Sequence, residues 1–303
     1  MEQIRLLLEP RIQLLFQESI ITMQPVAKAG EVNQVFAIST PTRKIIARVN
    51  DVSELDRFKK EQWCIKQATQ AGVKGAEVLD LGSNDEYAYM LMPYIEGKRA
   101  DQEGVDVDVV WRMIGEYAKK IHNIAVEGFG ENLEDMASGN LKKWRDYLEY
   151  NISSLGENDP LLKRGIISLE QSDLLRAHFT KLARLDVRLG LSHGDLSLDN
   201  VIVNEDKEVI LIDWGSAEGH LVPHYDLSVI LAESLSDDSE EFMQVLRGYG
   251  MTNDEYDGIK SQITSLTLLI AVDKVRWAID RSPQSLDANV AHLNKVLLRI
   301  TKK

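Results

Sequence analysis

One segment, Leu191–Ser216, constrains the fold of this chain more than any other. It reads LSHGDLSLDNVIVNEDKEVILIDWGS and holds two short apolar runs, Val201–Val203 and Val209–Ile212, on either side of a polar turn. Apolar β-branched runs that flank such a turn predict a β-hairpin. Asn200 precedes the first run and Asp213 follows the second, so the hairpin is expected to bring these two side chains together.

Asn200 and Asp213 offer oxygen ligands of the kind that a hard divalent cation prefers. In proteins Mg²⁺ usually takes one or two carboxylates together with phosphate oxygens and water. Asp195 lies on the loop just before the hairpin, where its carboxylate can accept a proton from a hydroxyl beside the metal. A cation on the phosphates and a carboxylate that holds the nucleophile are what phosphoryl transfer requires.

The same residues resemble the motif of a known family. His193-Gly194-Asp195, Asn200 and Asp213 match the H-G-D-x-x-x-x-N and downstream D-W pattern of the aminoglycoside phosphotransferase and choline kinase superfamily. The resemblance implies an α+β, two-lobed protein-kinase-like fold, with a small β-rich N-terminal lobe and a larger, mainly helical C-terminal lobe. It also implies that Asp195 is the catalytic base and that Asn200 and Asp213 bind Mg²⁺.

A segment downstream of the central motif extends the resemblance. Tyr225-Asp226-Leu227 is similar to the Y-D-L that the family carries after its metal-binding aspartate. This implies that Asp226 supports the catalytic loop and takes no direct part in catalysis. We expect His193 to be a hydrogen-bonded loop histidine, with no role in general catalysis.

The first third of the chain resembles the nucleotide-binding half of the family. Within Ala29–Phe36, Gly30 would permit a tight phosphate-covering turn and Asn33 would face phosphate oxygens, although the segment alone reads as an ordinary hairpin turn. Arg48 stands where protein kinases carry a lysine on the third strand, and it can bind phosphate bidentately. We expect Glu61 in the next helix to pair with Arg48; the alternative is an exposed helical glutamate.

The hinge between the lobes is expected around Met92 and Tyr94, whose main-chain groups would bind the nucleotide base. Main-chain contacts say little about the base, so ATP is expected and GTP is the alternative. We therefore predict a nucleotide-binding lobe over residues 1–94 and a catalytic, substrate-binding helical lobe over residues 95–303.

Hydrophobic periodicity predicts the regular elements. Strands are expected at residues 35–38, 44–49, 77–81 and 87–94, and helices at 52–71, 107–124, 141–153, 168–189 and 259–280. Ser53 is expected to cap the helix that starts near it. The core-facing stripe of the helix at 107–124 is expected to comprise Val109, Met113, Ile114, Tyr117, Ala118 and Ile121.

Composition excludes several classes of protein. The sum of 35 Lys and Arg against 48 Asp and Glu gives a net charge of −13, which repels phosphate backbones and makes nucleic acid an unexpected partner. The single cysteine, Cys64, allows no internal disulfide and indicates a reducing compartment. Glu2, Arg5 and Glu9 interrupt any secretory signal, and apolar runs are far shorter than the about 20 residues of a membrane span. We expect a cytoplasmic protein with no membrane partner.

These observations together favour an ATP- and Mg²⁺-dependent small-molecule kinase, similar to the aminoglycoside phosphotransferases, that transfers the γ-phosphoryl group to a substrate hydroxyl. A choline-, homoserine- or sugar-type kinase is the close alternative. A nucleotide-binding pseudokinase that acts as a partner module is the alternative from another class. A protein kinase is disfavoured because no A-P-E segment follows Asp213. The sequence leaves the acceptor and the oligomeric state open.

The acceptor is expected to carry a positive charge, as a hypothesis that rests on the net charge and on an acidic run in the second lobe. That run comprises Asp237, Asp238, Glu240 and Glu241. A run of this kind is more often a solvated helix start. The aromatic residues of the same lobe are expected to serve packing and not to form substrate platforms: Trp111, Trp144, Trp277 and Tyr147.

Overall fold

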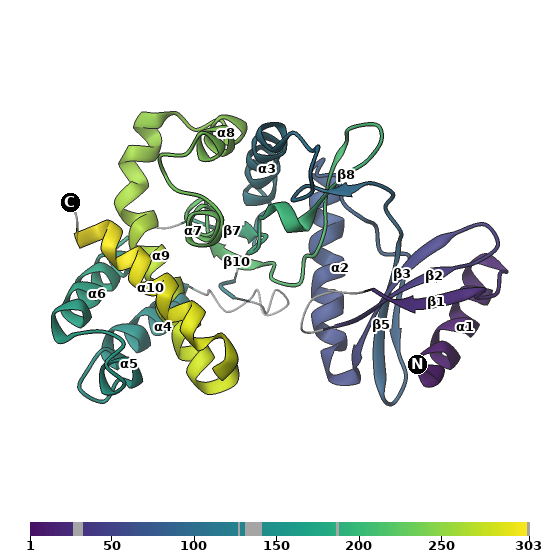
Figure 1. Cartoon of the computed structure of the whole chain (residues 1–303), viewed down its shortest axis with the longest axis horizontal. Helices are drawn as coiled ribbons and strands as arrows, with labels where there is room; N and C mark the ends of the chain where they lie inside the picture. Colours follow the sequence, from purple (N-terminus) through teal and green to yellow (C-terminus); the bar gives the residue numbers. More distant parts are fainter. Residues whose placement is uncertain (27–32, 127, 131–140, 186–187, 302–303) are drawn as a thin grey trace. The chain divides into compact units, whose positions relative to one another are not determined.

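Contacts within the chain divide the computed structural model into two units. The first comprises Met1–Val105 and Asn200–Gly215, and the second comprises Asp106–Asp199 and Ser216–Lys303. The structure describes residues 1–26, 33–126, 128–130, 141–185 and 188–301 (Figure 1). Contacts thus group residues 95–105 and 200–215 with the first unit, whereas the boundary at residue 94 separates lobes by function and stays a prediction.

The first unit contains a five-stranded antiparallel sheet in the order β1-β2-β3-β5-β4. Its strands are β1 (Thr22–Pro25), β2 (Gln34–Ser39), β3 (Lys44–Asp51), β4 (Asp80–Ser83) and β5 (Tyr87–Pro93). Side chains alternate along β3, so Ile45, Ala47 and Val49 are buried together on one face. Arg48 consequently lies on the other face, where it is available for a polar contact.

Two helices accompany this sheet, α1 (Glu2–Phe16) and α2 (Leu55–Gln70). Helix α1 has no counterpart among the predicted elements. Ile4, Leu8 and Ile12 recur four residues apart along it and share a core with the buried side chains of β2, β3 and β5. Helix α2 contacts β4 and β5.

The start of α2 differs from its prediction. Ser53 does not cap this helix, because Val52–Glu54 forms a turn of 3-10 helix that begins first. The Asp51 side chain accepts a hydrogen bond from the Ser53 amide at 2.9 Å, which places Ser53 inside the turn and not before it. The strand expected at residues 77–81 begins later, at β4.

A three-stranded sheet completes the first unit, in the order β6-β8-β9. Its strands are β6 (Lys98–Arg99), β8 (Val201–Val203) and β9 (Val209–Leu211). Strands β8 and β9 pair antiparallel from Val201 with Leu211 to Val203 with Val209. The hairpin predicted for this segment is therefore confirmed.

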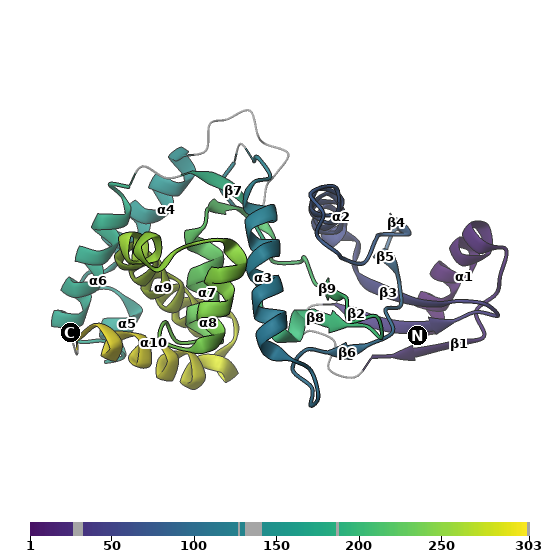
Figure 2. The ribbon, with the colours of Figure 1, turned by 90° about the horizontal axis from the view of Figure 1, so that it is seen from above.

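The second unit is mainly helical (Figure 2). Its helices are α3 (Val107–His122), α4 (Leu141–Ser154), α5 (Pro160–Lys163), α6 (Leu169–Leu182), α7 (His224–Glu233), α8 (Glu240–Tyr249), α9 (Asn253–Arg281) and α10 (Leu286–Thr301). Helix α9 contacts α5, α6, α7 and α10, and its buried residues Leu266, Leu269 and Val272 belong to an apolar core of this unit. Along the described stretches of the chain, no helix has both the length and the apolar character to cross a membrane.

Two predictions for this unit need correction. The helix expected at 168–189 ends at Leu182, and Leu189–Ser192 forms strand β7, which pairs antiparallel with β10 (Glu218–Leu221). The apolar stripe of α3 is confirmed at Ile114, Tyr117, Ala118 and Ile121, which are buried, but Val109 is 53% exposed and Val110 is buried instead. Helices α5, α7 and α10 are not predicted, and the acidic run indicates only the start of α8. The fold class is nevertheless the expected one, a small sheet-rich unit and a larger helical unit.

Candidate active site

The β8–β9 hairpin holds the backbone of Asn200 beside that of the residue before Asp213. The Ile212 amide donates a hydrogen bond to the Asn200 carbonyl at 2.9 Å, which continues the ladder of the hairpin by one step. Asn200 is buried, whereas the side chain of Asp213 is half exposed. The backbone at the two ends of the hairpin is therefore paired, and the approach of the two side chains stays a prediction.

Arg48 contacts two acidic side chains that lie far apart in the sequence. Its guanidinium forms an ion pair with Glu61 of α2, and its Nη2 atom lies 3.6 Å from Oδ1 of Asp213. Arg48 is 11% exposed and Glu61 only 2%. The predicted pairing of Arg48 with Glu61 is confirmed, and the alternative of an exposed helical glutamate is wrong.

Glu61 also ties helix α2 to the chain after Asp213. Its Oε1 atom accepts a hydrogen bond from the Trp214 amide at 3.2 Å. Burial raises the pKa of Glu61, and the nearby Asp213 adds to that effect, while the Arg48 guanidinium opposes it. The Lys60 ammonium donates to the next carbonyl, that of Gly215, at 3.1 Å. Two consecutive residues of α2 thus fix the segment that carries Asp213.

Asp213 itself adopts a left-handed backbone conformation, with φ of 58°. Such a conformation is uncommon for residues other than glycine, and asparagine and aspartate tolerate it best. The Gly215 amide lies 3.4 Å from Oδ1 of Asp213, and this turn leaves half of the side chain exposed.

Asn200 and Asp213 have the donor chemistry that Mg²⁺ requires, an amide oxygen and a carboxylate. Within the part of the chain that the structure describes, no three His, Cys, Asp or Glu side chains gather into a metal cluster. A cation that also binds phosphate oxygens and water needs only one or two protein carboxylates, so this donor set fits Mg²⁺. It does not fit a structural zinc site.

The structure describes three of the four other residues that are predicted to contact the nucleotide. Gly30 lies outside the described residues. Asn33 accepts a hydrogen bond from the side chain of Asn50 at 2.8 Å. Met92 is buried in β5, and the Tyr94 amide donates to the Lys44 carbonyl at 3.1 Å. Because that amide is already used, a base contact at Tyr94 would involve its carbonyl.

In the second unit, Asp226 anchors the loop that carries Asp195. The Asp226 carboxylate is fully buried and accepts hydrogen bonds from the amides of His193, at 3.0 Å, and Gly194, at 2.8 Å. Burial raises the pKa of Asp226, but hydrogen bonds, the largest from His122, outweigh that effect, so its pKa lies below the ordinary value. The geometry fits the supporting role that the family resemblance implies for Asp226.

His122 is a member of this network that the sequence analysis does not identify. Its Nε2 atom lies 2.8 Å from Asp226, and its Nδ1 atom lies 3.0 Å from the hydroxyl of Tyr249 in α8. His122 ends helix α3 and is 1% exposed. The only signal in the sequence is that this histidine continues the apolar stripe of α3.

Asp195 follows a glycine that no other residue could replace without strain. Gly194 has φ of 79°, and a Cβ atom there would lie 2.3 Å from the Ser216 carbonyl oxygen. Asp195 is half-buried and belongs to the second unit, whereas Arg48, Glu61 and Asp213 are brought together in the first unit.

The acidic run of the second unit lies at a helix start, which is the interpretation that the sequence favours. Ser239 caps α8 through the Phe242 amide, and Glu240 lies in the first turn. Ion pairs join Glu240 to Arg247 at 2.6 Å and Asp237 to Lys260 at 2.8 Å. These carboxylates are therefore engaged within the protein and no longer support a cationic acceptor.

Comparison with known proteins agrees with this geometry. A model of the phosphotransferase enzyme family (APH) matches residues 23–260. A search of curated proteins finds no match. Solved structures that match include a GDP and kanamycin complex of APH(2")-IIia, with 18% identity, 95% of this chain and 97% of that chain covered, and a TM-score of 0.68.

Two further matches come from other members of that enzyme group. Spectinomycin phosphotransferase APH(9)-Ia, in complex with ADP and spectinomycin, has 13% identity, covers 96% of both chains and has a TM-score of 0.64. Aminoglycoside phosphotransferase APH(4)-Ia has 18% identity, 96% and 97% coverage, and a TM-score of 0.65. At these identities the structures establish the shared fold, and the family model covers most of the chain. The chain belongs to the phosphotransferase enzyme family.

Proposed function

We propose that the protein transfers the γ-phosphoryl group of ATP to a hydroxyl group of a small molecule, with Mg²⁺ held by Asn200 and Asp213. Its family makes it a small-molecule phosphotransferase with a nucleotide cofactor and a hydroxyl acceptor. The observation that carries the finer proposal is the contact of Arg48 with both Glu61 and Asp213.

Arg48 would bind the phosphates of the nucleotide, because its guanidinium is always charged and its fork matches phosphate oxygens. Glu61, buried beneath it, would hold Arg48 in place and keep Asp213 in register through the Trp214 amide. Mg²⁺, when bound, neutralises charge on the transferred phosphoryl group. Gly30, Asn33, Met92 and Tyr94 remain proposed nucleotide contacts.

Asp195 would act as the general base. In the transfer, the acceptor oxygen forms a bond to the γ-phosphorus while the bond from that phosphorus to the β–γ bridging oxygen breaks. The hydroxyl proton passes to the Asp195 carboxylate, and ADP leaves with the bridging oxygen. Asp226 holds the amides of His193 and Gly194, and so positions the loop on which Asp195 lies.

A choline-, homoserine- or sugar-type kinase would carry out the same transfer on a different acceptor. A pseudokinase would bind nucleotide without transfer, and the presence of Asp195, Asn200 and Asp213 speaks against it because binding alone requires no general base. GTP is the alternative nucleotide.

A transfer assay separates these possibilities. The full chain is incubated with ATP or GTP, with Mg²⁺ or with EDTA, and with a panel of amino alcohols, aminoglycosides, sugars and nucleosides. We expect transfer from ATP to at least one hydroxyl compound, loss of transfer with EDTA and recovery with added Mg²⁺. Nucleotide binding without transfer to any acceptor class would favour the pseudokinase, and full transfer in EDTA would remove Mg²⁺ from the proposal.

A further inference from the structure

The helical unit contains a cavity that the sequence analysis does not foresee. Its volume is about 620 Å³, within the roughly 300–1,000 Å³ range typical of small-molecule sites. Aromatic side chains from separate elements form its walls: Phe129, Tyr147 of α4, Tyr225 of α7 and Trp277 of α9. Trp277 and Tyr147 were expected to serve packing alone, but Trp277 is 54% exposed and both line this cavity.

The cavity lies next to the loop that carries the proposed general base. Glu218 lines it and pairs with Ser192 across the β7–β10 ribbon, at the end where the chain enters the His193-Gly194-Asp195 loop. Ser216, two residues before Glu218, is in close contact with Gly194. A molecule held in the cavity therefore lies beside the segment from which Asp195 projects.

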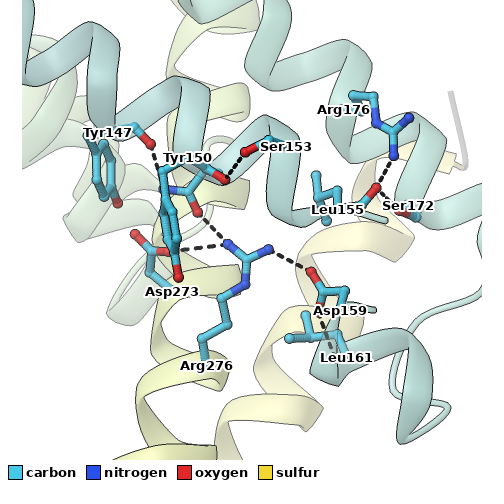
Figure 3. A network of polar contacts seen from close by, with 11 residues as sticks. Tyr147, Tyr150, Ser153, Leu155, Asp159, Leu161, Ser172, Arg176, Asp273 and Arg276 are labelled. Atoms are coloured by element: carbon cyan, nitrogen blue, oxygen red, sulfur yellow. Dashed lines mark hydrogen bonds and ion pairs between the residues drawn. The ribbon is translucent and has the colours of Figure 1, made fainter. Parts of the chain in front are cut away.

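Asp273 is a carboxylate in this cavity with only a distant cation. Arg276, one turn along α9, has its nearest nitrogen 3.9 Å from Asp273. The Arg276 guanidinium is already bound by Asp159 at 2.7 Å and by the side-chain oxygen of Asn151 (Figure 3). Over the described residues, no other ion pair of Asp273 is found. The exposed part of its side chain, 31%, borders the cavity.

The other ionisable groups of the cavity add negative charge or none. Lys274 forms an ion pair with Glu233, so its charge is already compensated. Burial lowers the pKa of His220 to about 3, so this histidine is neutral at physiological pH. Glu218 contributes a second carboxylate. The cavity therefore favours a cation and disfavours an anionic ligand.

We propose that this cavity binds the acceptor, and that the acceptor is an amino alcohol with one protonated amine on an apolar or aromatic body. Asp273 binds the ammonium group, and Trp277 and Tyr147 cover the apolar body, where cation–π attraction adds to burial. This inference rests on the proposed function. A sugar with many hydroxyl and amino groups would leave several of them unpaired against Leu266 and Leu269, at a considerable desolvation cost.

A matched pair of compounds tests the proposal. N-benzylethanolamine carries the amine, and benzyloxyethanol replaces that nitrogen with oxygen at nearly the same size. Calorimetry on the full chain without nucleotide measures binding alone. We expect the amine to bind at least about tenfold more tightly than the ether, since a hydrogen bond to a charged group is worth that much.

Variants on one helix assign the effect to the cavity. Asp273→Asn should weaken binding of the amine at least about tenfold and leave the ether unchanged. Asp280→Asn, two turns further along α9 and outside this cavity, should change neither. Trp277→Ala should weaken both compounds, because it removes contact with the shared ring. Thermal unfolding of each variant checks that it is folded.

Three results would overturn the proposal: equal binding of amine and ether, equal weakening in the two aspartate variants, or no binding of the amine at millimolar concentration. Tighter binding of kanamycin, unaffected by Asp273→Asn, would count against it as well. Because this assay needs no nucleotide, binding of the amine together with no transfer to any acceptor of the panel would refute the proposed function and leave the cavity's preference for the amine standing. Phosphoryl transfer that is unaffected by Asp273→Asn would support the proposed function and refute the assignment of the acceptor to this cavity.

Discussion

The surroundings of Asp273 disfavour the ionised form of its side chain. Burial raises its pKa from the ordinary range to about 7, and only the distant Arg276 guanidinium opposes this effect. The groups that face it across the cavity are Glu218 and His220 of β10, Tyr147 of α4 and Tyr225 of α7, and its neighbours on α9 are Lys274 and Arg276. A carboxylate held at such a cost is typical of a ligand-binding position.

The pKa of Asp273 makes stability depend on pH. Because its pKa is higher in the folded chain than in the unfolded chain, the folded chain binds the proton more strongly, and stability falls as pH rises from about 4 to about 7. Asp273→Asn cannot ionise, so its Tm should be a few degrees above that of the wild type at pH 8 and close to it at pH 5. Thermal unfolding at both pH values measures this.

The control for this experiment is Gly258→Ala on the same helix, which changes no titratable group, so its Tm difference from the wild type should not change with pH. If the Tm difference between Asp273→Asn and the wild type were the same at both pH values, ionisation of Asp273 would not destabilise the folded protein.

Asp195 is the residue on which the proposed chemistry depends. Asp195→Asn should lower kcat by at least about two orders of magnitude, the size of a general-base contribution, while the Kd for ATP stays nearly constant. Asp199→Asn changes an exposed aspartate four residues further along and should leave both quantities unchanged. Steady-state kinetics and nucleotide titration supply the measurements. Near-normal turnover of Asp195→Asn would exclude it as the base.

At the scale of elements, helix α2 holds the segment after Asp213 through two adjacent residues. Lys60 donates to the Gly215 carbonyl, whereas its neighbour Lys59 pairs with Asp56 on the helix surface. Lys60→Met should lower kcat/KM for ATP about three- to tenfold, the range expected for one hydrogen bond from a charged group.

Lys59→Met removes the same charge from the same helix and should have little effect, because exposed ion pairs contribute little. If both variants lost activity equally, the net charge of α2 would explain the result, and the contact with Gly215 would not.

Helices α3 and α8 approach each other at glycines. A Cβ atom at Gly248 would lie 1.8 Å from the Arg112 carbonyl oxygen, and one at Gly115 would lie 2.1 Å from the Val245 carbonyl oxygen. Gly248→Ala should therefore lower the free energy of unfolding by about 2 kcal/mol or more, since the helices must separate to admit a methyl group.

Gly258→Ala is the matched control, because Gly258 is exposed in α9 and an added Cβ there meets nothing within 4 Å. It should raise the free energy of unfolding by about 0.5–1 kcal/mol, the difference in helix propensity between the two residues. Denaturant unfolding of both variants would show opposite signs. The same sign for both would contradict the close contact of α3 with α8.

At the scale of the whole molecule, sequence patterns predict what short-range chemistry determines. The β8–β9 hairpin, the Arg48–Glu61 pair and the polar ends of the hairpin all follow from local spacing and from the family resemblance. Where packing between distant elements determines which residues are buried, sequence patterns predict the structure less well. Val109 fits the apolar stripe of α3 as well as Val110 does, and only the tertiary contact with α8 determines which is buried.

The cavity and the His122 network could not be predicted from spacing at all. The cavity gathers residues from Phe129 to Asn289, and no local pattern links them. No local pattern singles out His122, because its partner, Asp226, lies 104 residues away. Helix α1 is missed because charged residues and Pro10 mask the regular recurrence of its buried side chains.

The first unit is built from two separate stretches of the chain, and this affects how the protein folds while it is being synthesised. Strand β8 supplies a carbonyl to the Ala100 amide, and the Leu211 amide donates to the Lys74 carbonyl. A nascent chain that has just exposed Val105 therefore lacks these partners until about 110 further residues have been translated, roughly 5–20 s at ordinary rates. During that interval the sheet of β1 to β5 can form. The Lys74 carbonyl and the Ala100 amide, however, have not yet met their hydrogen-bond partners and can pair with another segment or another chain. The first unit therefore cannot complete its folding when Val105 leaves the ribosome. It must wait for Asn200–Gly215, the part of the same unit that is synthesised last.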